Sequence, residues 1–272
     1  MSYQLDDLLY LMTRLRDPQH GCPWDLQQNF ASIVPHTLEE AYEVADAIEQ
    51  GDYQQLQGEL GDLLFQVVYY AQLGQEEERF AWADVVDGIT RKLLRRHPHV
   101  FPDGNLRTLP ATQALAPEQV KQRWEEIKAE ERASKAEQPE QLSLLDDVPQ
   151  ALPSLSRAQK LQKRASRAGF DWPNAAPVVE KIAEELDEVR EALDQGNAAA
   201  VAEEMGDLLF CVVNLARHLG VDAEYALREG NNKFERRFRY IEEQLRLRGS
   251  CVEKTSLPSL DGLWDEAKAQ GL

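Results

Sequence analysis

The chain has 272 residues, 43% of them hydrophobic, which is enough for one large domain or two of ordinary size. Its net charge of −18 and its pI near 4.7 argue against a protein that holds duplex nucleic acid or an anionic membrane through bulk charge. Three widely spaced cysteines, in no CxxC motif, indicate a reduced, cytoplasmic setting. No signal peptide or transmembrane run is visible.

Long amphipathic segments with weak strand signals predict an all-α fold. The first helix is expected from Asp6 to Arg16. A second should begin at Thr37, a predicted N-cap with Glu40 in capping-box position, and end near Gln50. The next helix, around residues 60–70, is apolar almost all round, which predicts a central, buried position.

A pattern of four carboxylates occurs twice in the chain. The two sets are Glu40, Glu43, Glu59 and Asp62, and then Glu185, Glu188, Glu204 and Asp207. In both sets, matching carboxylates of the two pairs lie 19 positions apart (59 − 40 and 204 − 185). Residues three apart on a helix share a face. Since the turn-forming stretch 194–197 separates the second two pairs, we expect a helical hairpin whose carboxylates face each other.

Other landmarks recur in the same order, so the chain is predicted to be two copies of one helical unit. Basic clusters at 92–96 and 233–237 match, as do the tryptophans Trp124 and Trp264 and the segments 21–24 and 169–172. The expected boundaries are 1–130 for the first copy, 131–153 for a polar linker and 154–272 for the second copy. Residues 103–117 should form a loop inside the first copy.

Facing carboxylates repel one another unless cations lie among them. Oxygen-only ligands suit Mg²⁺, with Mn²⁺ as a substitute, rather than zinc or copper. A di-iron bundle is the competing metal site, but it uses Glu-x-x-His pairs, and no histidine stands at the third position here. Isolated acidic pairs are common on solvated helix faces, so the recurrence at fixed spacing carries the interpretation.

Lys233, Arg236 and Arg237 form a basic cluster in an acidic chain. Such clusters are mostly solvated faces, but this one is repeated in the first copy. Carboxylates for Mg²⁺ together with cations for phosphate describe a nucleoside polyphosphate site. Trp264 is a candidate for stacking on a base, with a core position as the equal alternative. A P-loop is absent from the sequence.

These motifs resemble the MazG family of all-α nucleoside triphosphate pyrophosphohydrolases, over essentially the whole chain. The resemblance implies hydrolysis between the α- and β-phosphates, in homodimers that complete the bundles, with the second copy active. It implies that Mg²⁺ is held by Glu185, Glu188, Glu204 and Asp207. It implies nucleotide contacts from Lys181, Glu184, Lys233, Arg236, Arg237 and Trp264. Those four metal ligands and Glu184, the expected base, form the implied catalytic set.

The two copies differ in ways that favour the second as the active one. His36 stands where the second copy has Lys181, and the path from the last carboxylate to the basic cluster is 30 positions in the first copy against 26 (92 − 62 and 233 − 207). Glu40, Glu43, Glu59 and Asp62 remain candidates for a second metal site. Two alternatives stay open: a regulatory nucleotide- or metal-binding module without turnover, and a purely structural helical dimer.

Overall fold

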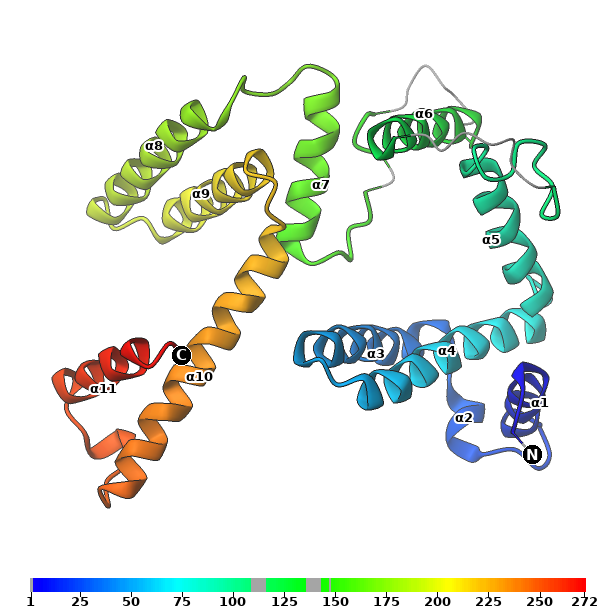
Figure 1. Ribbon diagram of the computed structural model, residues 1–272, viewed down its shortest axis with the longest axis horizontal. Coiled ribbons are helices and arrows are strands. Elements are labelled where there is room, and N and C mark those ends of the chain that lie inside the picture. Colours follow the sequence, from blue (N-terminus) through cyan, green and yellow to red (C-terminus); the bar gives the residue numbers. More distant parts are fainter. Residues whose placement is uncertain (1, 109–115, 136–142, 147) are drawn as a thin grey trace. The chain divides into compact units, whose positions relative to one another are not determined.

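A computed structural model describes residues 2–108, 116–135, 143–146 and 148–272 (Figure 1). Every regular element in these ranges is helical, which confirms the all-α prediction. The chain divides into two compact units, Met1–Ala136 and Glu137–Leu272. Residues 109–115 of the predicted loop, and residues 136–142 and 147 of the predicted linker, lie outside the described residues. Within the described chain, no helix has the length and apolar character needed to cross a membrane.

The two units share a layout built around a hairpin of long helices, α3 with α4 and α8 with α9 (Figure 1). The helices of the first unit are α1 (Leu5–Leu15), α2 (Pro23–Gln27), α3 (Phe30–Gln50), α4 (Tyr53–Glu76), α5 (Trp82–Arg96) and α6 (Pro117–Lys135). Those of the second are α7 (Ser154–Arg167), α8 (Ala175–Asp194), α9 (Ala198–His218), α10 (Ala223–Leu247), the 3₁₀ turn η2 (Val252–Lys254) and α11 (Leu257–Ala269). Helix α6 therefore extends into the stretch expected to be linker.

The start of α3 corrects the prediction that Thr37 caps this helix. Asn29 is the N-cap, and its side chain accepts hydrogen bonds from the backbone N–H groups of Ala31 and Ser32. Thr37 lies inside the helix, where its hydroxyl donates to the Ile33 carbonyl at 3.1 Å. The asparagine cap satisfies the first free N–H groups two turns earlier than expected, and so lengthens the helix ahead of Glu40.

Helix α4 is buried on one side only, so the prediction of a fully buried central helix is wrong within one chain. Val68 and Tyr69 pack in the core formed with α1 and α3. On its other side Leu60 is 50% exposed and Leu64 is 40% exposed. The helix is apolar on both sides, as predicted, but no helix among the described residues covers the side that carries Leu60 and Leu64.

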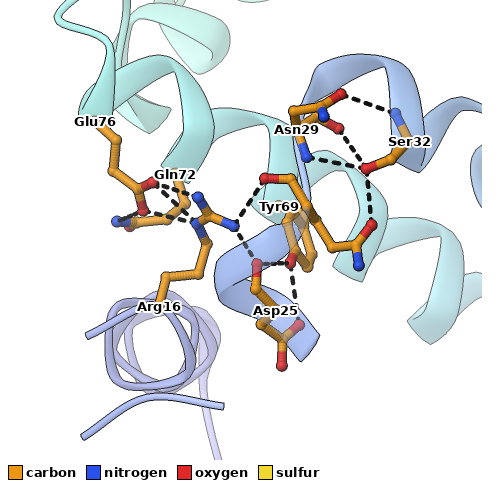
Figure 2. A network of polar contacts seen from close by, with 8 residues as sticks. Arg16, Asp25, Asn29, Ser32, Tyr69, Gln72 and Glu76 are labelled. Carbon is orange, nitrogen blue, oxygen red and sulfur yellow. Dashed lines mark hydrogen bonds and ion pairs between the residues drawn. The ribbon is translucent and has the colours of Figure 1, made fainter. Parts of the chain in front are cut away.

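A polar network fixes the segment before α3 onto α4 (Figure 2). Arg16 donates to both carboxylate oxygens of Glu76, at 2.8 and 3.0 Å from Nε, and Nη1 donates to the Asp25 carbonyl. The hydroxyl of Tyr69 donates to the Asp25 carbonyl at 3.0 Å and to Oδ1 at 3.1 Å. Burial raises the pKa of Tyr69 to about 12, so the hydroxyl keeps its proton.

The turn after α1 requires a glycine at position 21. A Cβ at Gly21 would lie 2.4 Å from the Leu15 carbonyl oxygen, which is too close for any other residue.

The second unit fixes the matching segment differently. Asp171 Oδ1 accepts hydrogen bonds from Arg217 and His218, at the end of α9. In both units an aspartate therefore anchors the segment before the hairpin to the end of the second hairpin helix, although the aspartates stand at different places in the motif.

We expect Tyr69→Phe to lower the free energy of unfolding by about 1–2 kcal/mol, because Asp25 is buried and would lose a hydrogen-bond donor. Urea unfolding followed by circular dichroism measures the change. Tyr3→Phe is the matched control, since Tyr3 is 91% exposed and should tolerate the same change without effect. Equal stability of the two variants would contradict the role given to this network.

Candidate metal and nucleotide site

The geometry of the second hairpin follows from its turn and its cap. Gly196 has φ of 66°, a left-handed conformation that glycine adopts without strain. Asn197 follows as the N-cap of α9, and its side chain accepts from the N–H groups of Ala199 and Ala200. The tight connection makes α8 and α9 pack side by side, so that Glu204 faces the acidic side of α8.

Three of the four predicted metal ligands converge in each unit. In the second unit these are Glu185, Glu188 and Glu204, which offer carboxylate oxygens that all lie within 4.8 Å of one another. In the first unit, Glu40, Glu43 and Glu59 do the same. Glu185 is only 5% exposed, whereas the first cluster contains no buried member. The fourth predicted ligands, Asp62 and Asp207, are exposed and stand outside these clusters.

In both clusters the carboxylates repel one another, and the pKa values of their glutamates show this. Desolvation raises the pKa of Glu188, and the charges of Glu185 and Glu204 raise it further against the opposing effect of Lys181. The pKa of Glu40 is raised by desolvation first and then by Asp62 and Glu43. Asp62 therefore lies close enough to act on the first cluster, although it is not among the three converging ligands. A cation among these oxygens would relieve the repulsion.

Lys181 is the cation that the structure places at the second cluster. Its Nζ lies 2.7 Å from Glu184 Oε1 and 2.9 Å from Glu185 Oε1, and these hydrogen bonds raise the pKa of the lysine. In the first unit, His36 Nδ1 lies 3.8 Å from Glu39 Oε2, a longer contact than either contact of Lys181. Glu184, the expected base, is exposed and paired with Lys181.

The predicted phosphate-binding cations and Trp264 lie on a different pair of helices. Lys233 and Arg236 are exposed on α10 and have no side-chain partner among the described residues. Arg237 Nε donates to the Leu272 carbonyl at 2.7 Å, and its guanidinium lies 5.3 Å from the centre of the Trp264 ring. Trp264 is half-buried against α10 rather than free to stack on a base.

The two halves of the predicted site are therefore not joined by direct contacts within one chain. Helix α11 packs on α10, whereas α8 packs on α9. Among the described residues, Lys233, Arg236 and Arg237 make no hydrogen bond or ion pair with the hairpin carboxylates. Three carboxylates and Lys181 form one group, and Arg237 and Trp264 form another.

Glu131 is a residue near the basic cluster that the sequence interpretation did not identify. It lies on α6, in the stretch read as linker, and pairs with Arg95 at 2.6 Å and Arg96 at 2.5 Å. The hydrogen bond from Arg96 is the largest cause that lowers the pKa of Glu131 to about 2. More than 30 positions separate Glu131 from its partners, so no local spacing indicates this contact.

Comparison with known proteins supports what the fold and the acidic hairpins indicate. The model of the MazG nucleotide pyrophosphohydrolase domain matches residues 28–101 and 175–241, which contain both hairpins. A nucleoside triphosphate pyrophosphohydrolase from Escherichia coli (strain K12) is 53% identical over 98% of this chain and 98% of its own length. A nucleoside triphosphate pyrophosphohydrolase/pyrophosphatase MazG from Thermotoga maritima is 40% identical, covering 97% of this chain and 95% of its own.

A third relative, the uncharacterized protein YabN from Bacillus subtilis, is 42% identical over 95% of this chain and 50% of its own length. The two-segment family match, together with relatives aligned over nearly their whole lengths, settles the family. This chain belongs to the MazG nucleotide pyrophosphohydrolase family.

The raised pKa values give a test of the repulsion in metal-free protein. A carboxylate whose pKa is raised on folding destabilises the fold when ionised, fully above its folded pKa and not at all below its unfolded pKa. We expect Glu40→Gln and Glu188→Gln to raise the melting temperature at pH 7 in EDTA. The gain should vanish as the pH falls below about 4, where glutamates become protonated.

Glu191→Gln, at an exposed position on α8, is the control and should leave the melting temperature unchanged. Lower melting temperatures for both cluster variants at pH 7 would contradict the proposed repulsion.

Proposed function

We propose that this chain hydrolyses nucleoside triphosphates between the α- and β-phosphates, giving a nucleoside monophosphate and pyrophosphate. The observation that carries the proposal is the convergence of Glu185, Glu188 and Glu204 within 4.8 Å in a chain of the MazG family. The names of the E. coli and T. maritima relatives point to the same reaction class.

Mg²⁺ is the cation that fits the second cluster best, with Mn²⁺ as a substitute. The converging donors are all carboxylate oxygens, which Mg²⁺ prefers. Glu185, Glu188 and Glu204 would hold the ion, and Asp207 would join them from the next turn of α9. When bound, the metal would orient a water and lower its pKa. The charge balance supports this fit, because Lys181 alone faces several carboxylates.

The remaining residues of the site have roles that follow from their chemistry. Glu184 is exposed beside the cluster and would accept the proton of the attacking water, after Lys181 has turned toward phosphate. Lys233, Arg236 and Arg237 would offset the charge that develops on the phosphates, and Trp264 would flank the nucleotide. These roles require α10 to meet an acidic hairpin, which assembly of two chains would achieve.

A homodimer is proposed because the second hairpin exposes apolar side chains that a single chain leaves uncovered. Val212 is 46% exposed, Leu209 is 51% exposed and Val179 is 52% exposed. A monomeric protein rarely presents so many neighbouring large apolar side chains on one hairpin. A two-fold interface through α8 and α9 would bury the same patch of both chains at once.

We expect Val212→Asp to reduce the mass measured by light scattering from two chains to one, because a carboxylate at the centre of an apolar interface is costly to bury. Leu219→Asp is the matched control, at a 63% exposed position just beyond the end of α9, and should leave the dimer intact. A wild-type protein of single-chain mass at micromolar concentration would contradict the proposal.

The first copy is proposed to bind a metal at Glu40, Glu43 and Glu59 without turning over nucleotide. Its three carboxylates also lie within 4.8 Å of one another, but it has no buried ligand and no lysine at the position of Lys181. Substitution of a carboxylate in the second cluster should therefore lower activity more than the matching substitution in the first.

We expect Glu185→Ala to lower the rate of pyrophosphate release roughly hundredfold or more, because a buried metal ligand is lost while the helix is kept. The matched first-copy variant Glu40→Ala should keep most of the activity. The assay is release of pyrophosphate from each common ribo- and deoxyribonucleoside triphosphate with Mg²⁺. Equal losses in both variants would contradict the assignment to the second copy.

The alternative is a regulatory module that binds nucleotide and metal without turnover. It shares the carboxylates and cations, so binding experiments do not separate the two. A wild-type protein that is stabilised by Mg²⁺ and nucleotide, yet releases no product, would favour this alternative. A structural helical dimer would show neither effect.

A further inference from the structure

Arg95 and Arg96 stand in the first unit where Arg236 and Arg237 stand in the second. Both pairs follow a lysine by three and four positions, in matching helices α5 and α10. If the second pair binds phosphate, as the proposed function holds, then the first pair has the chemistry to do the same. The two pairs differ, however, in the side chains that they contact.

Glu131 occupies both arginines of the first unit at once. Its Oε1 accepts from Arg95 Nη2 at 2.6 Å and Nε at 2.8 Å. Its Oε2 accepts from Arg96 Nη2 at 2.5 Å. The carboxylate side chain is only 14% exposed and that of Arg96 is 17% exposed, so water screens this contact poorly. A carboxylate shared by two arginines presents the same oxygens that a phosphate would offer.

The second unit has no such carboxylate at the matching position. Glu131 lies seven residues after Trp124, and seven residues after Trp264 is Gly271. Arg236 has no side-chain partner among the described residues, and Arg237 donates to the Leu272 carbonyl, which is uncharged. The second pair therefore remains available to an anion, whereas both arginines of the first pair already hold the Glu131 carboxylate.

We infer that Glu131 acts as an internal substitute for phosphate, which closes a polyphosphate-binding site at Arg95 and Arg96 and so confines nucleotide binding to the second copy. This inference rests on the proposed function for the location of the phosphate site. Two charge-assisted contacts to one carboxylate are strong in a partly buried setting. A polyphosphate entering the first unit would have to displace them, whereas in the second unit it meets an unpaired guanidinium.

Removal of the Glu131 charge should open the first site. Isothermal titration calorimetry of the full chain with inorganic tripolyphosphate and Mg²⁺ is the test. We expect Glu131→Gln to add a second class of binding sites to the one of the wild type. Glu130→Gln is the matched control, because it removes the same charge from an exposed neighbour on α6 and should bind like the wild type. Replacing Arg96 by glutamine in the Glu131→Gln chain should abolish the added class.

Binding by Glu131→Gln that equals binding by Glu130→Gln would overturn the inference. The comparison is between these two variants, so it holds even if the wild type binds nothing, an outcome that would count against the proposed function instead. If circular dichroism shows that Glu131→Gln does not fold, Glu131→Asp replaces it. Its shorter side chain reaches both arginines less well, so weak added binding is expected and its absence contradicts the inference.

Discussion

The repulsion between carboxylates that face each other across a helical hairpin is the constraint on which the rest of this structure depends. Three glutamates lie within 4.8 Å in each unit, and desolvation and neighbouring charges raise the pKa values of Glu40 and Glu188. A fold that only had to be stable would not keep this arrangement twice, because uncharged residues would pack there at lower cost. A cation held among the oxygens would relieve the repulsion.

The two copies balance this charge in different ways. In the second, Lys181 bridges Glu184 and the buried Glu185, and Arg236 on α10 has no side-chain partner among the described residues. In the first, His36 contacts Glu39 and the ring of Trp24, and Arg95 and Arg96 are both paired with Glu131. Both copies contain the acidic hairpin. The second differs in having a lysine at its carboxylates and, separately on α10, an arginine without a side-chain partner among the described residues.

Sequence patterns predicted those features that depend on residues near one another in the chain. The spacing of Glu185 and Glu188 and the turn before Asn197 were sufficient to predict the hairpin, and three of the four predicted ligands converge on it. The predicted start of α3 is too late, because Thr37 and Glu40 have the spacing of a capping box although Asn29, eight residues earlier, caps the free N–H groups of the helix. The predicted burial of α4 is too complete, since an apolar pattern does not tell which apolar side is covered within one chain.

Contacts across long sequence separations could not be predicted in this way. Glu131 and Arg95 are in contact although they lie 36 positions apart in the sequence, and Arg237 and the Leu272 carbonyl lie 35 positions apart. Both contacts depend on how α6 and the chain after α11 return onto a basic helix. The proposed meeting of α10 with the carboxylates would need a second chain, so sequence patterns within one chain do not predict its geometry.

The identity of the products tests the central claim most directly. Phosphorus NMR of wild-type protein incubated with a nucleoside triphosphate and Mg²⁺ distinguishes every outcome in one spectrum. A family member that cleaves between the α- and β-phosphates should give nucleoside monophosphate and pyrophosphate in equal amounts. Nucleoside diphosphate with inorganic phosphate would contradict the account.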